Sequence, residues 1–232
     1  MLDFSQFECV SFDCYGTLID WESGILGYLR PLLRSKGAKS SDSEILQMYS
    51  EFEPGEQAKS YRPYRDVLAS VVHDFARELR FEVSDDEAGG LAESIRDWQP
   101  FSDTIPALRI LKRKYKLAIL SNIDDDLFGY SAEKLEVPFD CVLTAQQVQS
   151  YKPSHNNFDQ LLQRLAIPRS RLLHVAESLF HDVAPANSLG IKTVWVNRRR
   201  GKPAAASKLV DAKPDMEVFD LADLAARVEP IL

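Results

Sequence analysis

The sequence is short of cysteine, of basic residues and of long apolar runs, and each shortage excludes a class of protein. Its three cysteines, Cys9, Cys14 and Cys141, are odd in number and lie in or beside apolar segments. They predict reduced core thiols in a cytoplasmic protein, rather than a disulfide framework or a metal site. The net charge of -7 at pH 7 argues against nucleic-acid binding, which requires a clustered basic surface.

Membrane-spanning and exported chains are disfavoured as well. No apolar run approaches the length of a membrane span. The first residues, Met-Leu-Asp-Phe-Ser-Gln, lack a basic region ahead of an apolar core, so we expect no signal peptide. No GxGxxG motif follows the first apolar run and GxxxxGK(S/T) is absent, so nothing indicates a dinucleotide site or a nucleoside triphosphatase. What remains is an ordinary globular chain, 45% hydrophobic and 27% charged.

A strand predicted near the N-terminus carries the first motif with chemical potential. The apolar run from Phe7 to Phe12 is followed at once by Asp13, with Gly16 and Thr17 close behind. This pattern is typical of a buried strand whose carboxyl end opens into a loop. Ligands bind at that end in open α/β sheets, so Asp13 is predicted to present a carboxylate there. A simple turn residue after a strand would give the same pattern.

The rest of the chain divides into two patterns. From 21 to 100 the apolar residues recur at helical spacing, and from 101 onward helices alternate with short apolar strands. A purely helical stretch of about eighty residues is too long for a crossover connection. We therefore predict a helical cap domain at 21–100, inserted into an α/β core domain made of 1–20 and 101–232. Repeated strand, helix, strand units in that core specify a parallel sheet covered on both faces.

Polar residues recur at the carboxyl ends of the predicted strands. They are Asp13; Ser121 with Asn122; Lys152, in the loop after its strand; and Glu177 with Asp182. Each alone has an ordinary explanation, because Ser and Asn often cap helices and Lys is usually a surface charge. Together, at one edge of a sheet, they suit nucleophilic catalysis by a carboxylate. A lysine near Asp13 would keep that carboxylate ionised and orient it.

The motifs that contain these residues resemble those of the haloacid dehalogenase superfamily. FDCYGTLIDWE, LAILSN, SYKP and HVAESLFHDVAPANSLGI match, in order and spacing, its nucleophilic Asp, its Ser or Thr, its Lys and its acidic loop. The resemblance covers nearly the full length and implies a Rossmann-like core with a helical cap inserted after the first motif. Within the superfamily the chain is most similar to the type II 2-haloacid dehalogenases, and more closely to the azetidine-2-carboxylate hydrolases.

This resemblance implies a mechanism and a role for each residue. Asp13 would displace the substituent at C2 of a small carboxylic acid, forming an aspartyl ester that water cleaves. Thr17 and Lys152 would position Asp13. Ser121 and Asn122 would bind the substrate carboxylate or orient the nucleophile, and Asp182 would help to activate water. The substrate pocket would be lined by Tyr15, Trp21 and Glu177. No cofactor is required, the partner is a small-molecule substrate rather than nucleic acid or a membrane, and a homodimer is left open.

Position 15 separates the subclasses. Phosphatases of the superfamily carry a second Asp there, which protonates the departing alkoxide, whereas this chain has Tyr15. A halide or a protonated ring amine leaves without such an acid, so Tyr15 favours attack at carbon. One alternative is a Mg²⁺-dependent phosphatase, in which Asp13, Asp182 and Glu177 would supply oxygen ligands. Another is a binding protein that keeps the fold without catalysis.

Several positions depart from the dehalogenase pattern. The halide-binding Arg has no counterpart around 41–44, Phe158 replaces a Tyr, and the loop 176–182 is longer and closer to the phosphatase form. Ring opening of a cyclic amino acid needs no halide site, so these changes favour that reaction. We further expect His174 to be a core residue and His181 to lie near the site. The basic run 198–202 is interpreted as a solvated loop.

Overall fold

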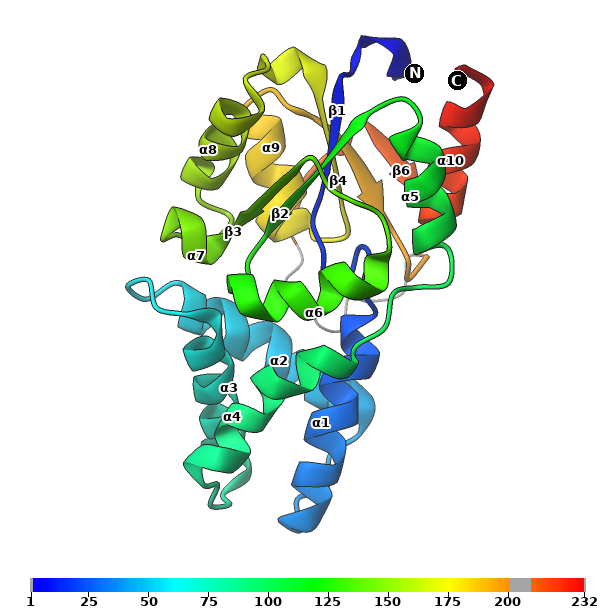
Figure 1. Ribbon diagram of the computed structural model, residues 1–232. Helices are drawn as coiled ribbons and strands as arrows, with labels where there is room; N and C mark the ends of the chain where they lie inside the picture. Colours follow the sequence, from blue (N-terminus) through cyan, green and yellow to red (C-terminus); the bar gives the residue numbers. More distant parts are fainter. Residues whose placement is uncertain (1, 201–209, 232) are drawn as a thin grey trace.

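A parallel sheet forms the centre of the computed structural model, which describes residues 2–200 and 210–231. Its strands are β1 (Cys9–Phe12), β2 (Lys116–Ser121), β3 (Cys141–Thr144), β4 (Leu172–Ala176), β5 (Lys192–Val196) and β6 (Met216–Val218). They lie in the order β3-β2-β1-β4-β5-β6 (Figure 1). Every neighbouring pair runs parallel, and Phe12 of β1 lies between Ile119 of β2 and Val175 of β4. The predicted α/β fold class is confirmed.

Helices make most of the connections. They are α1 (Trp21–Ser35), α2 (Asp42–Gln57), α3 (Tyr64–Leu79), α4 (Asp85–Glu93), α5 (Thr104–Lys112), α6 (Asp125–Leu135), α7 (Ala145–Val148), α8 (His155–Leu165), α9 (Ala184–Ser188) and α10 (Leu221–Val228). Short 3₁₀ turns lie at Phe4–Gln6, Ser94–Asp97, Arg169–Arg171 and Glu229–Ile231. A π-helical turn at Leu179–Val183 precedes α9.

Side chains alternate between the two faces of the sheet, and different helices cover each face. Val10 and Phe12 of β1 belong to the apolar cluster that includes α5 and α10, whereas Cys9 belongs to the cluster that includes α8 and α9 (Figure 1). All four residues of β1 are buried. A strand covered on both faces reads as a continuous apolar run, which is why the sequence pattern located β1.

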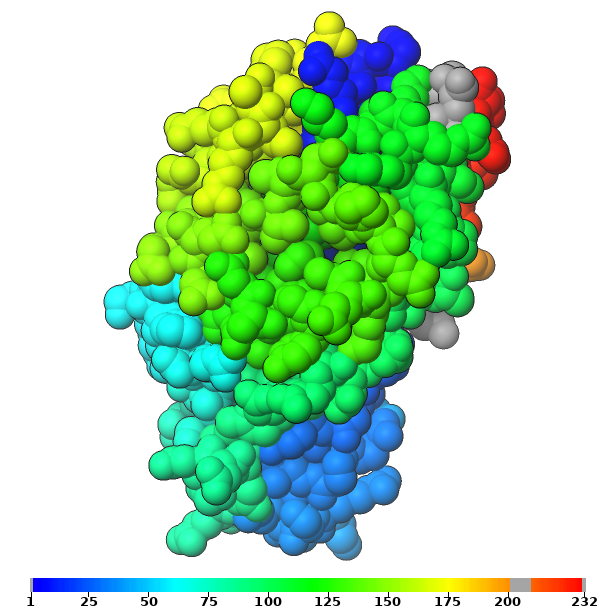
Figure 2. Space-filling model, in the orientation of Figure 1, coloured from blue at the N-terminus to red at the C-terminus, as the bar shows by residue number. Residues whose placement is uncertain are grey.

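Helices α1 to α4 form a bundle at the carboxyl ends of the strands, seen as the lower part of the molecule in Figures 1 and 2. An apolar stripe of Ile25, Leu29 and Leu33 on α1 is buried, as its helical spacing predicts. Ser41 and Ser84 begin α2 and α4 with capping boxes, which satisfy backbone N–H groups at those helix starts. The division into a core of 1–20 with 101–232 and a cap of 21–100 stays a prediction.

Hydrogen bonds attach this bundle to the loop after β2. The carboxylate of Asp124 accepts hydrogen bonds from the backbone N–H groups of Tyr64, at 2.8 Å, and Arg65, at 3.0 Å. An acidic side chain from the sheet thus stabilises the N-terminus of α3, where the helix dipole is positive. Tyr151 adds a hydrogen bond from its hydroxyl to the backbone oxygen of Arg62, at 2.8 Å. These contacts fix where α3 meets the sheet.

The basic run after β5 is not the solvated loop predicted from the sequence. Arg198 donates to the backbone oxygen of Thr17 at 2.6 and 3.0 Å and to the carboxylate of Asp103 at 3.0 and 3.2 Å. Arg199 donates to both carboxylate oxygens of Glu22 at 2.7 Å. The prediction was wrong because these partners are distant in sequence and meet the arginines only in the folded chain. Residues 201 and 202 of the run lie outside the described residues.

The structure also bears on the expectations for the cysteines and for a membrane-spanning helix. Cys9, Cys14 and Cys141 are free, and burial raises the pKa of the Cys9 thiol to about 12, so that thiol stays protonated at neutral pH. Within residues 2–200 and 210–231, no helix combines the length and the apolar character needed to cross a bilayer.

Candidate active site

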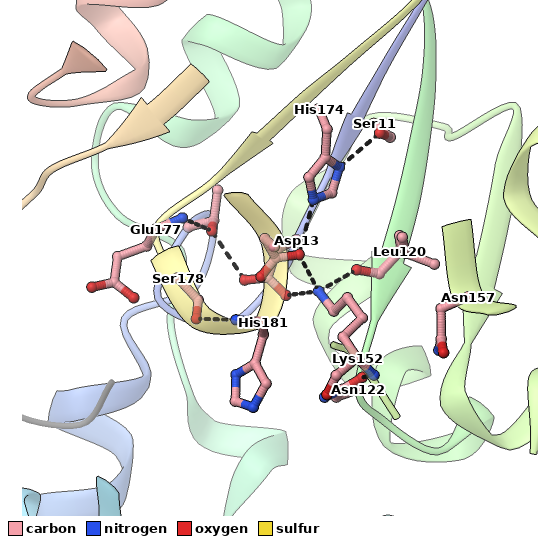
Figure 3. Close-up of polar contacts among 12 residues, drawn as sticks. Ser11, Asp13, Leu120, Asn122, Lys152, Asn157, His174, Glu177, Ser178 and His181 are labelled. Atoms are coloured by element: carbon pink, nitrogen blue, oxygen red, sulfur yellow. Dashed lines mark hydrogen bonds and ion pairs between the residues drawn. The ribbon is translucent and has the colours of Figure 1, made fainter. Parts of the chain in front are cut away.

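A buried ammonium group lies at the centre of the site. Lys152 Nζ donates hydrogen bonds to Asp13 Oδ1 at 2.9 Å, to Asp182 Oδ1 at 2.6 Å and to the backbone oxygen of Leu120 at 2.8 Å (Figure 3). The side chain of Lys152 is 1% exposed. Because an ammonium has three N–H donors, all of them are used by these partners. Strand β2, the segments after β1 and β4 and the loop before α8 therefore meet at one charged group.

Burial and charge act in opposite directions on these three residues. Burial alone would lower the pKa of Lys152, but the adjacent carboxylates of Asp13 and Asp182 outweigh it and raise that pKa. Burial raises the pKa of Asp182, yet Lys152 and His174 overcome this and lower it to about 2. For Asp13, burial prevails over Lys152 and the pKa is raised above its usual value. One ammonium shared by two buried carboxylates leaves Asp13 the more basic of the two.

Thr17 holds the second oxygen of Asp13. Its hydroxyl donates to Asp13 Oδ2 at 3.0 Å and accepts a hydrogen bond from the backbone N–H of Glu177 at 2.9 Å. Gly16, between them in the sequence, has φ +90, and a Cβ there would lie 2.9 Å from the indole nitrogen of Trp21. The turn after β1 therefore requires glycine. Asp13 is oriented through both of its oxygens.

His174 is buried in β4, as expected, but it also contacts the site. Its Nε2 lies 2.8 Å from Asp182 Oδ1, and its Nδ1 lies 2.8 Å from Ser11 Oγ (Figure 3). Since a carboxylate oxygen only accepts, Nε2 donates to Asp182, while Nδ1 is paired with the Ser11 hydroxyl. Asp182 Oδ2 is buried and has no hydrogen-bond partner among the described residues. Asp182 is thus oriented through one oxygen and keeps the other as a spare acceptor.

Asn122 lines the pocket, but its amide hydrogens are already used within the chain. Its amide nitrogen donates to the backbone oxygen of Lys152 and to Gln57 Oε1, both at 3.0 Å, and its oxygen accepts from the Lys152 N–H at 2.7 Å. Both amide hydrogens are used, so Asn122 holds the Lys152 loop rather than offering a donor to a ligand. Ser121, at the end of β2, lines the pocket described next.

A pocket opens beside Asp13, with a volume of about 40 Å³ for the centres of water-sized molecules. One water needs roughly 10–15 Å³ on that measure, so the space suits a ligand of few heavy atoms. The predicted site residues all line this pocket except Thr17, which is fully buried beside Asp13. His181 lines it too, as expected.

Tyr15 and Trp21 serve both as pocket wall and as packing. The Tyr15 hydroxyl lies 2.9 Å from Ser131 Oγ, and its ring packs edge-on against Trp98 with 5.8 Å between centroids. Trp21 packs edge-on against Tyr49 at 5.7 Å. Tyr15 thus occupies its position through contacts of its own, and its hydroxyl is engaged away from Asp13.

Three lining residues escaped prediction: Ser178 in the loop after β4, Glu53 of α2 and Tyr64 of α3. Glu53 Oε1 accepts hydrogen bonds from the Tyr64 hydroxyl, at 3.1 Å, and from the Gln57 amide. Burial, reinforced by the negative charge of Asp13, raises the pKa of Glu53 to about 7 against the opposing hydrogen bond from Tyr64. In the sequence Glu53 is one of many acidic residues on an amphipathic helix, and no local signal distinguishes it.

The departures from the dehalogenase pattern have a structural basis. Phe158, in place of Tyr, lies in the apolar cluster with α8 and packs edge-on against His174 at 5.2 Å. Arg30 pairs with Asp42 at 2.7 Å near the surface and is absent from the pocket lining among the described residues. The basic residue that lines the pocket is Lys152.

The magnesium alternative was tested against the same geometry. Asp13, Asp182 and Glu177 all line the pocket, but Asp13 Oδ1 and Asp182 Oδ1 are both already paired with Lys152 Nζ. Across 2–200 and 210–231, no group of three or more His, Cys, Asp or Glu side chains is arranged to hold a metal ion. As placed, these residues do not fit the predicted magnesium site.

Comparison with known proteins now identifies the family. The family model for haloacid dehalogenase-like hydrolases matches residues 7–190. The chain belongs to this family. The hydrolase is 28% identical over 192 residues to the (S)-2-haloacid dehalogenase of Pseudomonas sp. strain YL, with 82% of each chain covered. It is 27% identical over 227 residues to the enzyme of that name from Pseudomonas putida, with 95% of this chain and 96% of the relative covered.

Solved structures share the fold of this hydrolase. The L-2-haloacid dehalogenase from Xanthobacter autotrophicus, with chloropropionic acid covalently bound, aligns with TM-score 0.80 and 20% identity over 97% of this chain and 100% of that one. A magnesium-bound putative HAD-hydrolase from Bacillus subtilis aligns with TM-score 0.76 and 16% identity over 96% and 98%. The predicted superfamily is confirmed, whereas the closer likeness to azetidine-2-carboxylate hydrolases stays a prediction.

Proposed function

We propose that this hydrolase displaces the C2 substituent of a small 2-substituted carboxylic acid through a covalent aspartyl ester on Asp13. The observation that carries the proposal is the position of the Asp13 carboxylate, which lines the pocket while Lys152 and Thr17 each hold one of its oxygens. A carboxylate fixed in this way is oriented for attack on a bound carbon atom. The (S)-2-haloacid dehalogenases among its relatives support displacement at C2.

The first step forms the ester. An oxygen of Asp13 attacks C2 of the substrate, and the bond from C2 to its substituent breaks with both electrons leaving on the substituent. Burial favours this attack because it raises the pKa of Asp13 and makes its carboxylate more basic. The small pocket excludes bulk water while the ester exists.

The second step is hydrolysis of the ester. A water molecule attacks the Asp13 carbonyl carbon, the ester bond breaks, and the 2-hydroxy acid leaves. Asp182 Oδ2, the acceptor without a partner in the described chain, is suited to orient that water. Backbone N–H groups of the loop after β1 would stabilise the oxyanion.

This chemistry needs no cofactor, and its substrate is a small acid rather than nucleic acid or a membrane. The cytoplasmic location and the open question of a homodimer belong to the same proposal. A Mg²⁺-dependent phosphatase acting on a small phosphate ester is the rival that the acidic loop before α9 suggests. A binding protein without catalysis is the remaining rival.

The test is to trap the intermediate. The protein is mixed with 2-chloropropionate, azetidine-2-carboxylate or a small phosphate ester, each with magnesium or with a chelator, then quenched in acid and digested. We expect the peptide containing Asp13 to gain the mass of 2-chloropropionic acid less HCl, or the whole mass of azetidine-2-carboxylic acid because its nitrogen stays attached after ring opening, independently of the chelator. Turnover in heavy-oxygen water should then place heavy oxygen in Asp13. Chelator-sensitive phosphate release would select the phosphatase, and no mass gain with no turnover would select the binding protein.

A further inference from the structure

We propose that Glu53 makes this pocket select an acid whose C2 substituent is a protonated amine, and disfavours one whose substituent leaves as a halide. The inference rests on the proposed function and names the leaving group at the same site. Glu53 contributes a carboxylate to the pocket from α2, a helix of the bundle at the carboxyl ends of the strands. The substrate class would be small, ring-closed or open 2-amino acids that lose nitrogen from C2.

The charges of the pocket favour a cationic substituent. Its lining includes the carboxyl groups of Asp13, Glu53, Glu177 and Asp182 and the single ammonium of Lys152. That ammonium already gives its three hydrogens to Asp13, Asp182 and Leu120. A 2-haloacid would bring a second negative charge as its halide departs. A protonated 2-amino acid brings a positive one, which acidic walls attract.

The orientation of Glu53 leaves one oxygen for a ligand. Tyr64 and Gln57 both donate to Oε1, and Oε2 accepts no hydrogen bond from the residues that the structure describes. Tyr64 is itself fixed, because its backbone N–H donates to Asp124 at the start of α3. The carboxyl group is therefore held in place through one oxygen. Binding of an ammonium at Oε2 would form a charge-assisted hydrogen bond in a largely buried site.

A bound ammonium group would change the protonation state of Glu53. Burial raises its pKa to about 7, so in the free pocket its acid and carboxylate forms coexist near neutral pH. A cation bound next to a carboxyl group favours the ionised form. Glu53 would thus become a carboxylate when the amine binds, whereas a halide would meet either a neutral acid or a repelling charge.

With a protonated amine as the C2 substituent, every bond that forms or breaks is accounted for. Asp13 attacks C2, and the bond from C2 to the protonated nitrogen breaks with its electron pair passing to nitrogen. The nitrogen already carries the proton, so it leaves as a neutral amine and needs no proton donor at position 15. Water then cleaves the ester and regenerates Asp13, and the product is the corresponding 2-hydroxy acid.

The test compares the leaving-group preference of Glu53→Gln with that of the wild type. The quantity is the ratio of kcat/KM for azetidine-2-carboxylate to kcat/KM for 2-chloropropionate. Loss of one charge-assisted hydrogen bond is worth roughly 1.5–3 kcal/mol, so we expect this ratio to fall about tenfold to a hundredfold. Glu51→Gln is the matched control, because Glu51 lies on the same helix but is exposed, and its ratio should stay that of the wild type.

Other outcomes separate the two proposals. A ratio unchanged in Glu53→Gln, while Asp13→Asn is inactive, overturns the role of Glu53 and leaves the covalent mechanism standing. Wild-type preference for the halide substrate overturns that role as well. Turnover by Asp13→Asn, or no turnover of either acid by the wild type, overturns the proposed function and with it this inference.

A binding measurement avoids any folding defect of the Glu53 variant. Asp13→Asn, which keeps Glu53, is titrated with azetidine-2-carboxylate and with 2-chloropropionate in a calorimeter. We expect the amine to bind at least tenfold more tightly. Equal or weaker binding of the amine would contradict the proposal.

Discussion

The two sides of the pocket are built on different principles. On the sheet side, Lys152 joins Asp13 and Asp182 with N–O distances of 2.9 and 2.6 Å, so both carboxyl groups have the ammonium as a neighbour. On the side of the helical bundle, Glu53 is 5% exposed, and its hydrogen-bond donors are the neutral Tyr64 and Gln57. The sheet side holds a compensated charge cluster, whereas the bundle side presents a carboxyl group that lacks a cation.

From this difference we expect the sheet side of the pocket to carry out the reaction and the bundle side to recognise the substrate. Buried charges are tolerated when partners compensate them, so the sheet side can hold its charged groups in a fixed arrangement. A buried carboxyl group without a cation lowers stability, and its retention in a pocket is explained if a ligand supplies the missing charge. The comparison predicts that substitutions on the sheet side remove activity or fold stability. Substitutions at Glu53 should change substrate preference and improve stability.

The largest effect is expected for Asp13→Asn. Removing a nucleophile typically costs on the order of 10⁴-fold or more in kcat, because no other group forms the covalent bond. The fold should survive, since Lys152 keeps Asp182 and the Leu120 oxygen as partners. The measurements are steady-state turnover and circular dichroism through a thermal unfolding scan. Full activity in a folded variant would refute covalent catalysis by Asp13.

A smaller effect, on stability, is expected for Lys152→Met. The substitution leaves Asp13 and Asp182 buried without their counter-ion, and breaking such a pair costs about 3–5 kcal/mol of unfolding free energy. Urea unfolding at pH 7 measures the loss, which should shrink in acid as the carboxylates become protonated. Lys116→Met is the control, because Lys116 is exposed on β2 and surface changes usually stay within about 0.5 kcal/mol. Equal stability of the two variants would show that the cluster is not compensated as described.

The smallest effect is expected for Glu53→Gln, with the opposite sign. The pKa of Glu53 is raised from 4.5 to about 7 in the folded chain. A group of this kind stabilises the fold below its ordinary pKa and loses that contribution as pH rises through 7. With about 1.4 kcal/mol per pKa unit, wild type should lose up to about 3 kcal/mol relative to Glu53→Gln between pH 4 and pH 8.

That comparison isolates Glu53 from other titrating groups. Tyr49, Tyr64, Gln57, Asp13 and Lys152 face or influence Glu53 and are common to both proteins. Urea unfolding of wild type and variant across this pH range gives the difference directly. A constant difference across the range would mean that Glu53 titrates normally, and that the bundle side is compensated like the sheet side.

The fold and the sheet side of the pocket were accessible from the sequence. Each strand before a site residue is short, apolar and buried, and parallel strands bring their carboxyl ends to one edge. Asp13, Ser121 and Glu177 could therefore be placed together without knowing any contact between them. Lys152 was placed with them because it lies in the loop that follows its strand, and the order of the motifs supported that assignment.

Other features required long-range contacts that no local pattern encodes. The amide of Asn122 is taken up by Lys152 and Gln57, so its predicted role as a ligand donor does not match its position. The sequence predicts that His174 is a core residue, but in the structure His174 also forms a hydrogen bond with Asp182 and orients it. The sequence predicts that Arg198 is a solvated charge, but in the structure it donates hydrogen bonds to the backbone oxygen of Thr17.

The sequence by itself determined a parallel sheet with the carboxylate of Asp13 at its carboxyl edge, because strand periodicity and motif spacing are local properties of the chain. Only the tertiary structure decided which helical residues face that carboxylate. The reason is that an amphipathic helix fixes its buried face but not its place along a sheet. Here that place depends on Asp124 holding the first N–H groups of α3, a contact 60 residues apart in sequence that brings Tyr64, and through it Glu53, into the pocket.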